Sequence, residues 1–261
     1  MKRRVALTLL AGAAGWLAIG SFLPRGPAIQ ASRGVTIDQF LPSVHKYFPA
    51  VPTPDPWMII LEETFEGSFP GPWEVVDLFS GYGEYYWGKR SCQAGEGSYS
   101  GWAVGGGADG ANLGCGANYP VNVFTWMTYG PFSLAGATAA EMQFQQWVVT
   151  EEGYDVLCAL ASIDDFTYYG NCTAGIIATW VEGLLDFSNL DGAGLSYLGQ
   201  PNVWAGFMFF SDELITYNEG GYVDDVVLRK CQVASCPSFL PAQPAGNSEA
   251  RMFEKEPLED N

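Results

Sequence analysis

The feature that most constrains this chain is the texture of residues 57–232, where short runs of aromatic and β-branched residues alternate with clusters of Gly, Asn and Asp. Aromatic and β-branched side chains favour strands, and Gly, Asn and Asp favour the turns between them. Many short strands separated by turns are typical of an all-β sandwich or barrel. A stretch of about 175 residues fits one such sandwich rather than two domains.

These runs predict ten strands, at residues 58–66, 73–79, 85–92, 98–104, 124–129, 141–150, 155–162, 176–187, 203–211 and 221–229. The run 176–187 could also form a helix, but Gly183 and its β-branched residues favour a strand. Polar and apolar residues alternate from Glu141 to Trp147, which predicts a strand with one wet and one buried face.

Both ends of the chain differ from this central part. Lys2, Arg3 and Arg4 precede an uncharged apolar run over residues 5–23, which is typical of a signal peptide covering residues 1–31. An uncleaved N-terminal membrane anchor is the alternative, because a run of this length can just cross a bilayer. Alternating prolines predict a linker over residues 32–56, and the polar composition of residues 233–261 predicts a disordered tail.

All six cysteines follow the leader, and their even number predicts disulfides in an oxidising compartment. Six cysteines allow 15 pairings, and the sequence alone does not choose among them. Pairing between neighbours closes the shortest loops and would join Cys92 to Cys115, Cys158 to Cys172, and Cys231 to Cys236. Buried free thiols and a zinc site are weaker alternatives, since the chain has no C-x-x-C motif and a single histidine, His45.

The chain is strongly acidic, with 29 acidic and 12 basic residues and a net charge of −17. Removal of residues 1–31 would take away Lys2, Arg3, Arg4 and Arg25 and no acid, so the balance would become −17 − 4 = −21. Nucleic acid is excluded as a partner on this ground, because its phosphates would be repelled. A divalent cation is a plausible partner, although acidity also serves solubility.

Two end motifs carry a family resemblance. Residues 63–73 contain Glu63-Thr64-Phe65-Glu66-Gly67 followed by Phe69-Pro70 and Trp73, and residues 221–228 read Gly-Tyr-Val-Asp-Asp-Val-Val-Leu. Together they resemble the first and last strands of MAM-like modules, which include the cleaved-adhesin and choice-of-anchor J domains and modules appended to immune inhibitor A metallopeptidases. The resemblance covers residues 57–231. It implies a two-sheet antiparallel jelly roll whose first and last strands are neighbours.

If those strands are neighbours, Glu63 and Glu66 approach Asp224 and Asp225. Four carboxylates in one corner repel one another, and a hard cation with oxygen ligands would relieve the repulsion. The resemblance implies a structural calcium ion in this region, and we expect Glu66 and Asp225 to be its main ligands. The alternative is that these acids cap strand ends in water.

No catalytic set is recognisable. A zinc protease needs an H-E-x-x-H motif and a serine or cysteine hydrolase needs a paired histidine, which one histidine in the linker does not supply. A glycosidase needs only two suitably spaced carboxylates, which the sequence neither identifies nor excludes. For binding, aromatic residues among glycines predict exposed rings at Tyr82, Tyr85 and Tyr168.

We therefore expect a secreted or cell-surface, non-catalytic adhesion or ligand-binding module, stapled by disulfides and holding a structural Ca²⁺. Its ligand would be a surface polysaccharide or a protein, and it would meet a membrane only through an uncleaved leader. The alternatives are a targeting domain for a separate secreted peptidase and, after that, a carbohydrate-active enzyme.

Overall fold

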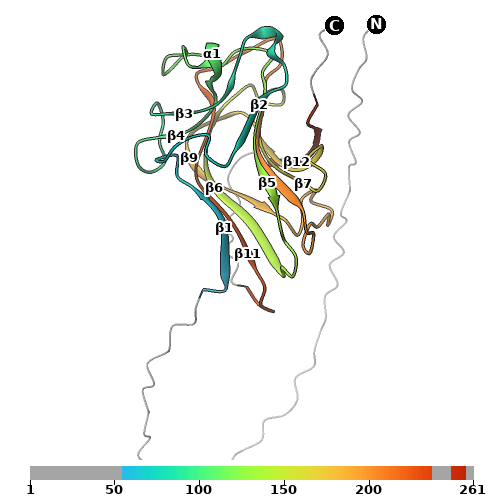
Figure 1. Cartoon of the computed structure of the whole chain (residues 1–261). Coiled ribbons are helices and arrows are strands. Elements are labelled where there is room, and N and C mark those ends of the chain that lie inside the picture. Colours follow the sequence, from blue (N-terminus) through green and yellow to red (C-terminus); the bar gives the residue numbers. More distant parts are fainter. Residues whose placement is uncertain (1–54, 237–247, 257–261) are drawn as a thin grey trace, which may run out of the picture. The chain divides into compact units, whose positions relative to one another are not determined.

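A computed structural model describes residues 55–236 and 248–256, which form two six-stranded antiparallel sheets (Figure 1). Sheet A contains β1 (Trp57–Glu63), β3 (Tyr86–Arg90), β4 (Ser100–Gly106), β6 (Ala139–Val149), β9 (Ile176–Asp186) and β11 (Gly220–Cys231). Sheet B contains β2 (Glu74–Asp77), β5 (Phe124–Phe132), β7 (Val156–Ser162), β8 (Thr167–Thr173), β10 (Val203–Phe210) and β12 (Ser248–Glu254). One short helix, α1 (Gly107–Gly110), and a 3-10 turn, Ser80–Tyr82, complete the elements. The all-β, two-sheet jelly-roll prediction is confirmed.

The predicted leader at residues 1–31 and most of the predicted linker, up to residue 54, lie outside the described residues. Within the two described ranges, no helix is long and apolar enough to cross a membrane.

Strand β11 is the central strand of sheet A. One of its edges pairs with β6, while its other edge pairs first with β4, at Tyr222 and Val223, and then with β1, where Val226 lies opposite Glu63. The pairing with β6 slips between Asp224 and Val227. The opening and closing segments of the family resemblance are therefore side by side, as predicted.

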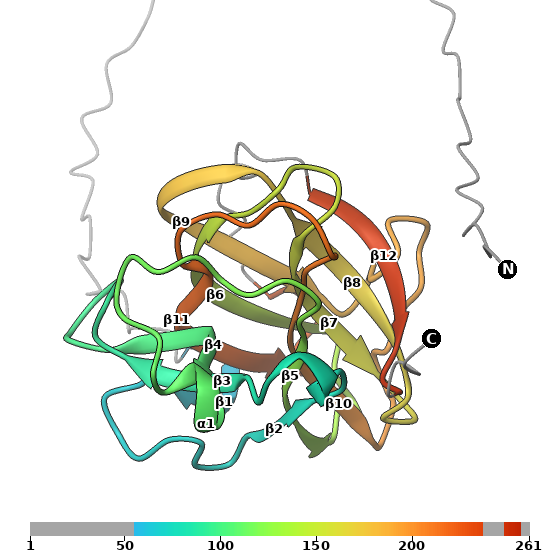
Figure 2. The ribbon, with the colours of Figure 1, turned by 90° about the horizontal axis from the view of Figure 1, so that it is seen from above.

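Sheet B follows the order β12-β8-β7-β10-β5-β2 and contains the two strands that the sequence prediction missed, β8 and β12 (Figure 2). The prediction of a disordered tail over residues 233–261 is wrong for residues 248–254, because β12 pairs with β8 along its whole length. An edge strand needs only one packed face, and Phe253 packs against apolar residues on the outer side of sheet B.

Side chains on the facing sides of the two sheets form the main core, in which Phe144 of sheet A meets Phe207 of sheet B at 4.9 Å between ring centroids. A second apolar cluster, which we call the outer cluster, covers the outer side of sheet B and includes Phe124, Trp126 and Met208.

The three predicted disulfides are all present, joining Cys92 to Cys115, Cys158 to Cys172, and Cys231 to Cys236. In the outer cluster, Cys158 and Cys172 are direct cross-strand partners on β7 and β8.

Lys255 fixes the end of β12. Its ammonium lies 3.2 Å from both Thr128 Oγ1 and Asp165 Oδ1 and 3.5 Å from Glu74 Oε2, and only 8% of its side chain is exposed. We expect Lys255→Met to lower the free energy of unfolding by about 1–2 kcal/mol, because Asp165 and Thr128 each lose a hydrogen bond from a buried ammonium. Denaturant unfolding and amide hydrogen exchange in β12 would measure the change.

Lys230→Met is the matched control, because the Lys230 ammonium donates one hydrogen bond to the Ser133 carbonyl at the surface. Its expected effect is within about 0.5 kcal/mol. Equal effects of the two substitutions, with unchanged exchange in β12, would contradict the role assigned to Lys255.

Candidate ligand-binding site

The outer side of sheet A carries a row of aromatic rings. Gly221 faces sheet B, since a Cβ there would contact Phe209 and Leu157, so its neighbour Tyr222 points outward. Trp102 stacks on Tyr222 with 5.4 Å between ring centroids, and Trp147 meets the same ring edge-on at 5.7 Å. All three rings are buried, so other parts of the chain cover this side of sheet A.

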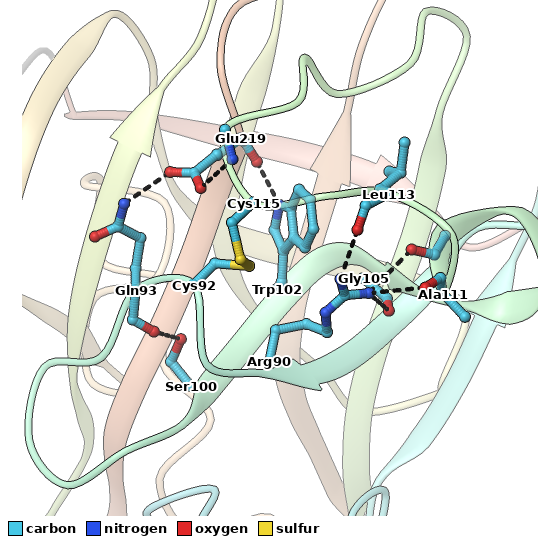
Figure 3. The surroundings of a disulfide bond; sticks show 12 residues. Arg90, Cys92, Gln93, Ser100, Trp102, Gly105, Ala111, Leu113, Cys115 and Glu219 are labelled. Carbon is cyan, nitrogen blue, oxygen red and sulfur yellow. Dashed lines mark hydrogen bonds between the residues drawn. A yellow bond between two sulfur atoms is a disulfide. The ribbon is translucent and has the colours of Figure 1, made fainter.

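The cover consists of the segments 91–99 and 107–118, which the Cys92–Cys115 disulfide joins (Figure 3). Glu219 holds both segments, because its carboxylate accepts hydrogen bonds from the Gln93 side chain and from the Gly116 backbone N–H, each at 2.7 Å. The Glu219 carbonyl also accepts a hydrogen bond from the Trp102 indole. This aromatic row is therefore closed to a ligand.

Arg90 adds a further tie within the cover. Its guanidinium lies over the Trp102 ring and donates hydrogen bonds to the carbonyls of Gly105, Gly110 and Leu113 (Figure 3). One half-buried side chain thus fixes the segment around α1 through contacts with its backbone carbonyls.

The outer side of sheet B is open in contrast. A cavity of about 430 Å³, which we call the outer groove, has Phe124, Val156 and Phe210 among its lining residues. Residues 251–254 of β12 and Glu256 line it as well, together with Tyr154. Tyr154 is 59% exposed and Met252 of β12 is 53% exposed. An apolar lining with charged residues beside it is the usual make-up of a ligand-binding groove.

The three tyrosines predicted as ligand-binding residues differ in exposure. Tyr82 is exposed and packs on Phe79 at 4.9 Å, and Phe79 in turn packs against the outer cluster. Tyr85 is half-buried against the core.

The prediction for Tyr168 is wrong, since its ring is fully buried beside Trp126, at 5.0 Å, and its hydroxyl donates a 2.5 Å hydrogen bond to Asp165. Burial and the Asp165 carboxylate raise the pKa of this tyrosine well above its usual range.

Tyr154 and Phe210, which line the outer groove, were not predicted as site residues. Tyr154 follows Glu151-Glu152-Gly153 in a turn, and an aromatic residue in a turn of acidic residues and glycine is the only signal the sequence offers. Phe210 ends a run that is apolar throughout, so its composition does not separate it from the buried residues before it.

The acidic residues predicted to bind calcium serve mainly as acceptors for backbone N–H groups. Glu63 accepts hydrogen bonds from the Phe65 N–H at 2.7 Å and from the Trp73 indole at 3.2 Å. Glu66 accepts hydrogen bonds from the backbone of Ser98 and Tyr99, and these lower the pKa of its carboxyl. Each of these two acids therefore fixes a chain segment without a metal ion.

Asp224 and Asp225 lie at the irregularity in β11. Asp224 is fully buried and accepts hydrogen bonds from the backbone of Gly95 and Asp225, each at 2.8 Å. Burial raises the pKa of Asp224 to about 6 against the opposing effect of these bonds. Burial and the nearby Glu96 carboxylate raise the pKa of Asp225. The calcium ion expected at Glu66 and Asp225 stays a prediction.

In the part of the chain that the structure describes, a different set of three carboxylates is compact enough to surround an ion, namely Glu151, Asp155 and Asp212. Asp155 accepts hydrogen bonds from the Tyr119 hydroxyl at 2.5 Å and from the Asp212 backbone at 2.8 Å. These bonds account for the burial of Asp155 and give this set a structural role beside Tyr119.

Comparison with known proteins gives no family. No protein-family model and no curated protein matches the chain. Among solved structures it is similar to a xylan-binding domain from Paenibacillus barcinonensis, with 12% identity over 70% of this chain and 100% of that one and a TM-score of 0.43.

Two further solved structures are similar to a comparable degree. A cleaved adhesin domain of Lys-gingipain from Porphyromonas gingivalis has 13% identity over 66% and 98% of the two chains and a TM-score of 0.41. A family 11 carbohydrate-binding module from Clostridium thermocellum has 12% identity over 70% and 98% and a TM-score of 0.42. Likeness at this level carries no conclusion about a ligand, so the function has to be inferred from the residues of this chain.

The raised pKa of Asp224 predicts a pH dependence of stability. Because the pKa of Asp224 in the folded state, about 6, exceeds the ordinary aspartate value of 3.8, protonation favours the folded state. This contribution is complete below about pH 4 and is lost as pH rises through 6, at a cost of up to about 3 kcal/mol. The measurement is the free energy of unfolding between pH 4 and 7 for the native chain and Asp224→Asn.

We expect the native chain to lose stability with rising pH relative to the Asn variant across this range, since Asn does not titrate. Asp191→Asn is the control, because Asp191 lies on an exposed turn and its pKa is lowered rather than raised. Parallel profiles for the native chain and Asp224→Asn would contradict the assignment.

Proposed function

We propose that this chain is a non-catalytic, extracytoplasmic binding module whose outer groove holds a segment of a neutral glycan. The observation that carries the proposal is the contrast between the two outer sides. Sheet A buries its aromatic row of Trp102, Tyr222 and Trp147, whereas sheet B leaves an open groove with aromatic lining and the exposed ring of Tyr154.

The chemistry of the groove suits a sugar chain. The apolar face of a pyranose packs on planar aromatic rings, and its hydroxyls bond to polar groups beside them. Tyr154 provides an exposed ring, Phe124 and Phe210 provide an apolar floor, and Glu254 and Glu256 provide acceptors. The net charge of −17 disfavours anionic polysaccharides, so the ligand is neutral.

The compartment follows from the disulfides. Three disulfides within one sandwich are typical of proteins that fold outside the reducing cytoplasm, where such bonds persist. This supports a secreted or surface-exposed location for the module.

A peptide ligand is the second candidate, and β12 is the observation that favours it. This strand ends the pairing order of sheet B, so its outer edge has no partner strand among the described residues. An extended peptide can add to such an edge through backbone hydrogen bonds. A partnership with a separate peptidase stays a prediction.

To test the glycan proposal, we expect Tyr154→Ala to weaken binding of a soluble neutral polysaccharide about fivefold to tenfold, because a stacked ring contributes about 1 kcal/mol or more. Affinity electrophoresis against a panel of neutral polysaccharides, with polygalacturonate as the anionic comparison, would find the ligand, and calorimetry would measure the loss.

Tyr99→Ala is the matched control, since Tyr99 is also exposed but lies in the cover of sheet A, where Lys89 packs over its ring. Equal losses in both variants, or binding to polygalacturonate alone, would overturn the proposal. Failure of every polysaccharide together with capture of an extended peptide would favour the second candidate.

We also propose a structural calcium ion at the acidic corner, with Asp225 and Glu66 as its ligands. In support, Asp225 lies beside the charge of Glu96, and its raised pKa reports an environment that disfavours an uncompensated carboxylate. A cation with oxygen ligands would relieve that cost.

If the ion binds, calcium at about 100 times its dissociation constant stabilises the fold by about 2.7 kcal/mol, so millimolar calcium should raise the melting midpoint relative to EDTA. Asp225→Asn should abolish the rise, and Asp186→Asn, at the end of β9, should preserve it. Identical midpoints of the native chain in calcium and in EDTA would remove the proposal.

A further inference from the structure

A cavity of about 270 Å³ lies between the two sheets, on the side where β9 and β8 face each other. We call it the inter-sheet cavity. Its inner part is apolar and includes Phe144 of sheet A and Phe207 of sheet B, which are both buried. Asn189 and Gly192, which are exposed, line its outer part. It is therefore reached from solvent without passing through the outer groove.

Gln146 is the unusual residue of this cavity. It lies two residues after Phe144 on β6, so its side chain points into the space between the sheets, and it is only 5% exposed. Among the described residues its amide makes no side-chain hydrogen bond, and its amide atoms are not fully buried, so they are accessible from the cavity. An amide that faces the cavity and is unpaired within the chain is available to a molecule bound there.

Two polar residues of β8 line the same cavity. Asn171 and Thr173 both point inward, because Cys172 between them faces the outer cluster. Neither side chain bonds to another described residue. The cavity thus combines the amides of Gln146, Asn171 and Asn189 and the Thr173 hydroxyl with two aromatic rings, and no basic residue lines it.

Water alone is a poor occupant for such a space. A cavity of about 270 Å³ has room for several water molecules, each of which needs two to four hydrogen-bond partners. The rings of Phe144 and Phe207 offer such waters no hydrogen bond. The space suits a molecule with hydroxyl or amide groups on one side and an apolar face on the other.

We propose that the inter-sheet cavity binds one uncharged sugar ring, with the Gln146 and Asn171 amides and the Thr173 hydroxyl bonded to its hydroxyls and the Phe144 ring against its apolar face. The Asp186 carboxylate, which accepts two hydrogen bonds from Ser188, also lines the cavity, and without a basic residue in the lining it disfavours an anionic ligand. The sugar can be a free monosaccharide or the end of a glycan chain. The site does not depend on the outer groove.

The decisive variant is Gln146→Leu, because leucine has a similar size and removes the amide. If the cavity is only a packing defect, this variant is as stable as the native chain or more stable, and ligand binding does not change. If the cavity is a binding site, Gln146→Leu weakens binding at least tenfold without loss of the melting midpoint. Gln145→Leu is the matched control, because Gln145 precedes Gln146 on the same strand and lies on its outer side. Thr173→Val repeats the test with an isosteric change.

The probes are free neutral monosaccharides at millimolar concentration in one arm and linear oligosaccharides of the same sugars in the other, with ligand-observed NMR as the readout. Free sugars that bind to the native chain and to Tyr154→Ala, but not to Gln146→Leu, support the proposal. Binding of oligosaccharides alone, lost in Gln146→Leu, assigns the site to chain ends.

Binding that Tyr154→Ala removes and Gln146→Leu leaves intact overturns this inference and keeps the outer groove. Absence of binding by any free sugar or chain end, with Gln146→Leu at least as stable as the native chain, overturns it as well.

Discussion

The structure depends on the way β11 changes partners. Its edge away from β6 pairs with β4 at Tyr222 and Val223 and with β1 from Val226 onward, and the change falls at Asp224 and Asp225. Asp225 has a left-handed backbone, with φ of 48°, which an aspartate tolerates better than most residues. The neighbouring Asp224 carboxylate accepts the Gly95 N–H and so ties the loop between β3 and β4 to the same point. The joining of β1 and the closure of that loop are therefore two consequences of one irregularity.

Much of this fold could be predicted from the sequence. Runs of aromatic and β-branched residues between turn residues indicate the strands, and the residues of the two end motifs indicate which strands are neighbours. The strands that escaped prediction show what such patterns miss. Gly170 and Asn171 resemble a turn, yet they lie inside β8, where a Cβ on Gly170 would come within 2.2 Å of the Ala159 carbonyl oxygen. A glycine required by a close approach between strands cannot be told from a turn glycine by composition. β12 escaped because its residues acquire a packed face only from β8 and the outer cluster.

The candidate site was less predictable than the fold, since exposure is decided by segments far apart in the sequence. Tyr168 and Tyr154 have similar surroundings along the chain, but Tyr168 lies on a strand with partners on both sides and beside Trp126, whereas Tyr154 lies in a turn beside the outer groove. The surroundings of the acidic residues are likewise decided by segments far apart in the sequence. Glu66 looks like a metal ligand by charge alone, but the backbone of Ser98 and Tyr99 uses one of its oxygens. Which donors reach a carboxylate is a property of the folded loops.

Strand β6 has a polar residue, Gln146, at an inward position, and this departure from the polar–apolar pattern affects both faces of the strand. From Met142 to Phe144 the apolar residues face sheet B, and strict alternation then places Gln146 inward and Trp147 outward. The outward ring of Trp147 is packed, because it contacts Tyr222 in the aromatic row that the disulfide-linked cover closes. The inward amide has no such partner on the opposite sheet, where Asn171 and Thr173 are the polar neighbours along the same cavity. A register shifted by one residue would have turned the tryptophan toward sheet B and the glutamine toward the cover, at the cost of turning Phe144 away from Phe207. The packing of that aromatic pair therefore fixes both the closed side of sheet A and the polar wall inside the sandwich.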